Sequence, residues 1–135
     1  MSRRTRAALL WVGLICWALG VLWLSSLTPQ ELPKAAFVLW DKADHVLAYT
    51  VGGWLAATAI RASRRGTATA TWFVPAVALI TVFGVLDEYV QSFTPGRSGG
   101  DRYDLVADLV GAVLGALLST WAYRRFGTRT RPANV

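Results

Sequence analysis

Long apolar runs separated by short polar segments make up most of the chain. The first run has no charged residue in the 24 positions from 7 to 30, which is longer than the ~20 residues that a helix needs to cross a bilayer. The Arg-rich start also fits the basic region of a secretory signal, but the apolar run is too long for one and no convincing small-x-small cleavage site follows. We therefore predict a retained membrane-spanning helix at residues 8–27.

A second uncharged run begins at Gly66. Its helix is predicted to end before Pro95, because proline cannot continue a helix and disfavours helical geometry at the residue before it. This predicts a span at residues 70–91. The extension places three polar residues on the helix: Asp87, Glu88 and Gln91.

Two further apolar runs are too short to cross hydrocarbon by themselves. Each has 15 uncharged residues, one after His45 and one after Asp108. At ~1.5 Å per residue such a run covers only ~22 Å of the ~30 Å required. These helices must either thin the bilayer or extend through neighbouring polar residues, and we favour the second option. We predict spans at residues 43–60 and 104–123, with polar groups drawn into the protein near the membrane boundary.

Composition agrees with a membrane environment. Of 135 residues, 54% are hydrophobic and 16% are charged, so a single membrane domain over residues 1–135 is expected. The net charge of +6 does not indicate nucleic-acid binding, because the Arg residues form short clusters between apolar runs. The single cysteine, Cys16, excludes an intramolecular disulfide. Three Trp residues near the run ends suit an interfacial aromatic belt: Trp40, Trp72 and Trp121.

The distribution of basic residues predicts the orientation. Ten Arg residues lie on one side of the predicted spans and four basic residues lie on the other, and basic residues are enriched on the cytoplasmic side of membrane proteins. We therefore predict an all-α membrane protein with four transmembrane helices and with its N and C termini in the cytoplasm. All eight carboxylates then lie at the extracytoplasmic end. Residues 126–135 are predicted to form a mobile tail.

Polar residues at the extracytoplasmic ends recur at helical spacing. In three of the predicted helices, residues three or four apart form a stripe that is polar at its outer end and small further in. Small residues let helices approach closely, so three packed stripes would form one polar pocket, and the GxxxG form also allows a helix-mediated homo-oligomer. The stripes are Asp41, His45, Tyr49, Gly52 and Ala56, then Thr81, Gly84, Glu88 and Gln91, then Asp104, Asp108, Gly111 and Gly115.

Some polar residues fall outside the stripes. Lys42, Asp44 and Asp87 are expected to be exposed to solvent or to the interface, and the glycines within residues 96–100 are expected to turn the loop rather than to form an anion-binding nest. A structural reading of the whole cluster also stays open, because ionisable groups in membrane helices usually pair in the bundle interior.

Three polar segments of the chain resemble a known family. "DKADHVLAY" at residues 41–49, "DEYVQSFTPGR" and "DLVADLVGAVLG" are similar, in this order, to the VanZ-like family of small bacterial membrane proteins. That family's pattern reads roughly D-K-x-x-H-x-x-x-Y, then E-x-x-Q-x-x-x-P-x-R, then D-x-x-x-N-x-x-G. Asp108 stands where the family often has Asn, and the extra carboxylate would favour a cation or a second proton-accepting group. The resemblance implicates Asp41, Lys42, His45, Tyr49, Glu88, Gln91, Pro95, Arg97, Asp104 and Gly111.

The resemblance implies a multi-pass protein of the bacterial cytoplasmic membrane with a link to glycopeptide (teicoplanin-type) resistance. The polar pocket itself predicts binding of a lipid-linked phosphate or a phospholipid headgroup at the outer leaflet. Arg97, with Lys42, would hold the phosphate, because Arg offers a bidentate fork. His45 would act as general acid or base, since its ordinary pKa lets it exchange protons near neutral pH.

Carboxylates of the pocket would orient His45 or hold a divalent cation, for which oxygen ligands are suited. The candidate catalytic residues are His45, Glu88, Asp104 and Asp108. The candidate substrate-binding residues are Asp41, Lys42, Tyr49, Gln91 and Arg97. The candidate metal ligands are Asp41, His45, Glu88, Asp104 and Asp108.

Two other functions fit the same sequence. The chain is alternatively a non-catalytic accessory protein that binds an envelope lipid, a cell-wall precursor or a partner membrane protein. A lipid flippase ranks last, because it predicts polar groups deeper in the spans, where only Thr58, Thr81 and glycines occur.

Overall fold

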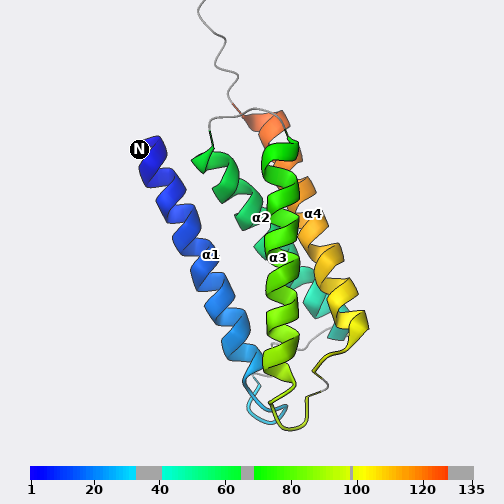
Figure 1. The fold of residues 1–135 in the computed structure, drawn as a ribbon. Coiled ribbons are helices and arrows are strands. Elements are labelled where there is room, and N and C mark those ends of the chain that lie inside the picture. Colours follow the sequence, from blue (N-terminus) through cyan, green and yellow to red (C-terminus); the bar gives the residue numbers. More distant parts are fainter. Residues whose placement is uncertain (33–40, 65–68, 98, 128–135) are drawn as a thin grey trace, which may run out of the picture.

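The fold is an all-α bundle of four helices. The computed structural model describes residues 1–32, 41–64, 69–97 and 99–127, and within them it has no strand. The helices alternate in direction, so the start of α1 and the end of α4 lie at one end of the bundle, opposite the loops at 26–32 and 92–101 (Figure 1). The helices are α1 Arg3–Ser25, α2 Asp41–Ser63, α3 Ala70–Gln91 and α4 Arg102–Phe126.

Helical geometry continues through the polar ends, as the sequence predicts. α3 ends at Gln91, before Pro95, while α2 begins at Asp41. The side chain of Asp101 accepts a hydrogen bond from Tyr103 N at 2.8 Å and so caps the start of α4. At the other end α4 runs to Phe126, and residues 128–135 of the predicted tail lie outside the described residues.

Three of the helices, α1, α3 and α4, are long and apolar enough to cross a membrane. Large apolar side chains cover the outer surface of these helices, among them Leu19, Val82 and Leu118. This arrangement fits a multi-pass membrane protein. α2 is not among the three; it packs against α1, α3 and α4, and many of its inward residues are Ala and Gly, which contribute little hydropathy.

α2 and α4 pack closely because small residues line their contact. A Cβ atom at Gly111 would lie 2.5 Å from Val46 O of α2, and one at Gly115 would overlap Thr50 O. Deeper in the contact, Thr58 and Ser119 share a buried hydrogen bond of 2.9 Å. The GxxxG glycines thus serve the contact between α2 and α4 inside one chain, so their sensitivity to substitution would not identify an oligomer.

α1 is the least buried helix, and it is attached mainly to α2. The indole of Trp17 lies over Gly52, where a Cβ atom would overlap the ring, and its Nε1 donates to Ala48 O at 3.0 Å. At the opposite end of α1, Arg3 donates to Ala62 O at 3.0 Å and thereby satisfies a free carbonyl in the last turn of α2.

The predicted Trp belt is wrong at one position. Trp72 is 1% exposed and packs against the ring of Tyr123, with ring centroids 6.5 Å apart, so it belongs to the core. Trp121 is 60% exposed, as an interfacial residue would be. Trp40 lies outside the described residues.

Candidate functional site

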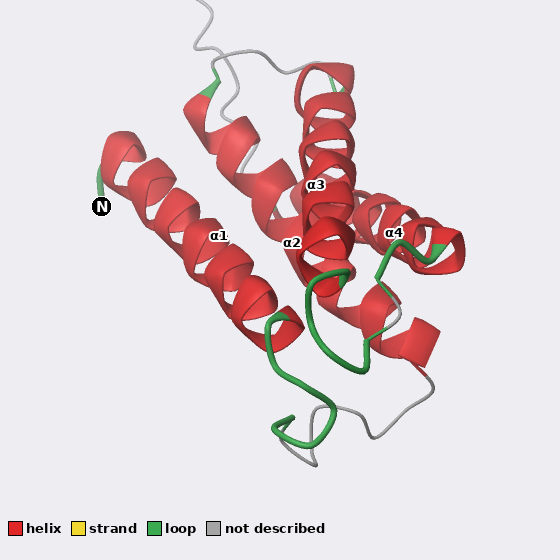
Figure 2. Ribbon diagram, turned by 60° about the horizontal axis from the view of Figure 1, so that its bottom comes forward, coloured by secondary structure: helices red, strands yellow, loops and turns green. Residues whose placement is uncertain are grey.

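The carboxylates of the chain gather at the end of the bundle that carries loops 26–32 and 92–101. All eight Asp and Glu residues belong to these loops or to the helical turns next to them. Figure 2 shows this end turned forward, with the start of α4 close to the end of α3. The side chain of Asp41 lies outside the described part, although its backbone begins α2.

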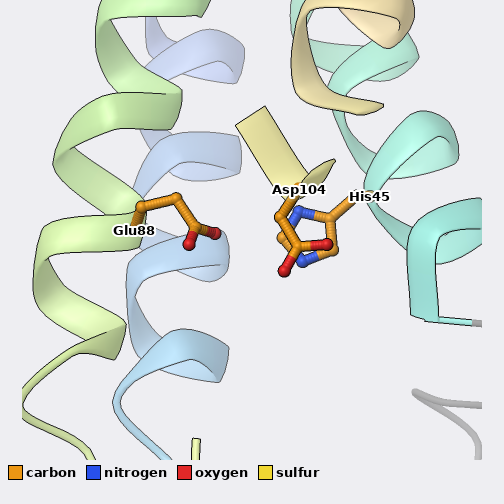
Figure 3. Close-up of side chains that lie close together, drawn as sticks. All are labelled: His45, Glu88 and Asp104. Carbon is orange, nitrogen blue, oxygen red and sulfur yellow. The ribbon is translucent and has the colours of Figure 1, made fainter. Parts of the chain in front are cut away.

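Three side chains from three helices converge at this end. His45 of α2, Glu88 of α3 and Asp104 of α4 each offer a ligand atom, and these atoms all lie within 4.8 Å of one another. Figure 3 shows the carboxylates of Glu88 and Asp104 turned toward the same space as the imidazole. The His45 side chain is 10% exposed, and both carboxylates are almost fully buried. We call this group the three-helix cluster.

Glu88 also holds the loop that follows α3. Its Oε2 accepts hydrogen bonds from Gly100 N at 2.8 Å and from Asp101 N at 3.1 Å. Gly96 and Gly100 adopt positive φ angles of 78° and 83°, so both turn the loop, as predicted. The expectation that the loop glycines form no anion-binding nest is wrong for Gly100, because its N–H and the next one along the chain both donate to the Glu88 carboxylate. The sequence does not reveal that the loop returns its N–H groups to Glu88, because no residue pattern reports where a backbone amide points.

Lys42 joins the start of α2 to the start of α4. Its Nζ donates to Asp101 Oδ2 at 2.9 Å and also to Asp104. The expectation that Lys42 is exposed is therefore wrong: its side chain is 20% exposed. The long aliphatic stem carries the ammonium group across to the neighbouring helix, although the residue lies off the predicted stripe.

His45 is paired with the carboxylate that departs from the family pattern. Its Nδ1 lies 2.8 Å from Asp108 Oδ1, and Asp108 is 1% exposed. Gly84 of α3 leaves the space for this pair, because a Cβ atom there would lie 2.7 Å from Asp108 Oδ2 and 3.3 Å from a ring carbon of Tyr49. A carboxylate at Nδ1 fixes the orientation of the imidazole ring.

Asp87 lies in the site and is hydrogen-bonded to other residues of the site. It is 1% exposed, and its Oδ2 accepts from Tyr49 Oη at 3.1 Å and from Gln91 Nε2 at 3.2 Å. The prediction of an exposed Asp87 is wrong because spacing of three or four residues from Gly84 admits Asp87 as well as Glu88. Gln91 in turn accepts from Arg97 at 3.1 Å, which brings the loop cation to the same network.

A cavity of about 110 Å³ lies beside the three-helix cluster, and His45 is one of its lining residues. α1 forms one of its walls, so the pocket is not built from the second, third and fourth helices alone. The sequence does not indicate that α1 lines the pocket, because the residues that α1 contributes are apolar or small. Asp44 lines the cavity and is half-buried, where an exposed residue was expected. The lining residues include Leu24, Ser25, Asp44, His45, Asp87 and Arg97.

Asp101 at the edge of the site is held in its charged form. The hydrogen bond from Lys42, followed by that from Tyr103 N, keeps the pKa of this carboxyl below its usual range. A depressed pKa stabilises the fold above the unfolded pKa of about 3.9, and this contribution disappears as the pH falls through the folded pKa.

The substitution Asp101→Asn is expected to remove this pH dependence. The unfolding temperature of the wild type should exceed that of the variant above pH 4, and the difference should shrink as the pH falls below 4. Thermal unfolding in detergent between pH 2.5 and 7 measures it. Lys42→Gln should weaken the same dependence, and a difference that grows at low pH would contradict the assignment.

The chain was compared with known proteins by sequence and by structure. No family model, curated protein or solved structure matches it. The groups of the site suit two kinds of chemistry: a cation held by carboxylates and an imidazole, and a phosphate held by Arg97.

Proposed function

We propose that the chain is a VanZ-like, four-span membrane protein that binds a phosphate-bearing lipid headgroup at its carboxylate-rich end. The ligand would be a phospholipid or a lipid-linked envelope precursor of the bacterial cytoplasmic membrane. The charge distribution along the bundle supports an extracytoplasmic site, because the Arg clusters lie at the opposite end, with the start of α1 and the end of α4. Both termini are then cytoplasmic.

A fourth span by α2 is supported by its packing. The lower hydropathy of α2 comes with small side chains that contact α1, α3 and α4. A helix enclosed in this way needs fewer large apolar side chains to lie at membrane depth, since its neighbours cover much of its surface.

The observation that carries the proposal is the convergence of His45, Glu88 and Asp104 within 4.8 Å, beside a cavity that Arg97 also lines. These ligand types suit Mg²⁺ or Mn²⁺, and the imidazole also allows Zn²⁺. His45, Glu88 and Asp104 would hold such a cation, and its positive charge would attract a phosphate. Arg97 would contact the remaining oxygens through its planar guanidinium.

The negative charge of the site requires compensation, which a divalent cation can supply. Lys42 and Arg97 are the permanent cations of the described network, and they accompany five carboxylates. An excess of three negative charges results when His45 is neutral, and burying uncompensated charge is strongly unfavourable. One divalent cation offsets most of this excess. The five carboxylates are Asp87, Glu88, Asp101, Asp104 and Asp108.

Headgroup binding is expected to depend on Arg97. Native mass spectrometry of the full chain in mild detergent should show one retained phosphate-bearing lipid, and Arg97→Gln should lower its retention about tenfold, since a hydrogen bond to a charged group is lost. Arg102→Gln is the matched control, because Arg102 lies at the same end and its guanidinium stacks on Tyr103 instead. Equal retention by wild type and Arg97→Gln would contradict the proposal, and no retention by either would favour the accessory role.

A chemical step on the same headgroup is the second candidate, and the His45–Asp108 pair favours it. In this candidate Glu88 and Asp104 would hold the cation, and the imidazole, oriented by Asp108, would instead take the proton of a water molecule. The water oxygen would bond to phosphorus as the ester oxygen leaves and takes a proton from solvent. His45→Ala should then stop hydrolysis of the phosphate ester while lipid is still retained. Binding without hydrolysis in the wild type would leave a headgroup-binding protein without hydrolase activity. A link to glycopeptide resistance stays a prediction of the family resemblance.

A further inference from the structure

A second cavity lies at the Arg-rich end of the bundle, remote from the site above. It has a volume of about 420 Å³ and is formed by α1, α2 and the last turn of α4. Two Arg side chains reach it, one from α1 and one from α2. The lining residues include Arg6, Trp54, Thr58, Arg61, Tyr123 and Phe126.

Arg61 is fixed in this cavity by aromatic rings. Its guanidinium carbon lies 4.2 Å from the centroid of the Tyr123 ring and 5.9 Å from that of Trp72. The residue is half-buried, and its Nε is buried without a hydrogen-bond partner in the structure. Stacking on rings occupies the face of a guanidinium and leaves its N–H donors in the plane, where a planar or tetrahedral oxyanion binds.

No carboxylate side chain is available to Arg61. The sequence has no Asp or Glu in residues 1–30, 45–86 or 109–135, which include all of α1 and the cavity-lining parts of α2 and α4. Asp44, the nearest carboxylate on the same helix, lies 17 residues earlier, or about 26 Å along the axis. Arg6 shares the cavity and carries the same charge. Two cations in a partly apolar cavity repel each other until an anion from outside joins them.

We infer that this cavity binds the phosphate of an anionic phospholipid from the leaflet at the Arg-rich end. The surroundings of the two Arg residues favour a lipid over a free ion. Trp54 is 40% and Phe126 69% exposed on the apolar outer surface, so acyl chains and glycerol can lie against rings while the phosphate contacts Arg6 and Arg61. Arg61 also lies in the last turn of α2, at the depth where headgroups meet a helix end. This inference does not depend on the proposed function of the carboxylate-rich end.

The test compares lipids on the full chain in neutral detergent by native mass spectrometry. Wild type should retain one phosphatidylglycerol at least about tenfold more strongly than phosphatidylcholine, and Arg61→Gln should lose this preference. Arg64→Gln removes the same charge one turn later, on an exposed residue outside the cavity, and should change the preference by less than about twofold.

A second variant and a competition with inorganic phosphate complete the test. Arg6→Gln, on the exposed surface of α1, should also weaken the preference and serves if Arg61→Gln does not fold. Inorganic phosphate at millimolar concentration should not displace the lipid; displacement would show that a free phosphate is the ligand. Equal preference in Arg61→Gln and Arg64→Gln, or no preference in the wild type, would overturn the inference.

Discussion

Glu88→Gln is expected to lower the affinity of the protein for a divalent cation by at least about 100-fold, since changes even to groups that only support metal ligands cost 10- to 100-fold. Gln removes the charged ligand from the three-helix cluster. Its amide oxygen can still accept from Gly100 N and Asp101 N, so the loop should remain in place. Mn²⁺ binding to the full chain in detergent, followed by electron paramagnetic resonance at pH 7, measures the change.

The control for this experiment is another carboxylate at the same end of the bundle. Glu31 is exposed in loop 26–32, where it accepts from Thr28 N at 2.9 Å and from Thr28 Oγ1 at 2.7 Å. Glu31→Gln should leave Mn²⁺ affinity within about twofold, as expected for a charge at the surface. A wild type that binds no Mn²⁺, or a Glu88→Gln variant that binds it equally well, would show that protons and not a cation neutralise the cluster.

Gly115→Ala is expected to destabilise the fold by about 1–3 kcal/mol, the range for added atoms in a well-packed core. The added Cβ would overlap Thr50 O and lie 2.5 Å from Trp54 N, and both are backbone atoms of α2 that cannot rotate away. α2 and α4 would have to separate, with loss of contacts along their length. Thermal unfolding in detergent, followed by tryptophan fluorescence, measures the effect.

Gly20→Ala is the matched control: it adds the same methyl group but is not expected to destabilise the fold. A Cβ atom at Gly20 meets nothing within 4 Å, so Ala should be neutral or should stabilise α1 by up to about 1 kcal/mol through helix propensity. If Gly115→Ala were as stable as Gly20→Ala, the close contact between α2 and α4 would be wrong. If it only changed the oligomeric state, the GxxxG surface would face another copy of the chain.

The helices could be predicted because their limits follow from local rules. Pro95 ends α3 after Gln91, and the shortness of the apolar runs after His45 and Asp108 predicts the polar first turns of α2 and α4. The stripes of residues three or four apart also predict that His45 and Glu88 lie close together, as they do in the structure.

What the sequence did not predict depends on how the helices are rotated and on the backbone of the loop. Asp87 and Glu88 both fit a stripe through Gly84, and only the packing of α3 against its neighbours shows that both are buried. Trp72 at a run end suits an interface by composition, yet it fills the core beside Tyr123. The α1 wall of the cavity has no polar pattern that a sequence could display.

The bond between Glu88 and the loop amides makes the loop a reporter of the site. Gly100 N donates to the same carboxylate that faces the three-helix cluster, although Gly100 itself is exposed. Any change in the charge around Glu88 alters the strength of this hydrogen bond, and with it the rate at which the Gly100 amide proton exchanges with solvent. Events in a buried site can therefore be followed from an amide at the surface of the protein, without a label placed in the site.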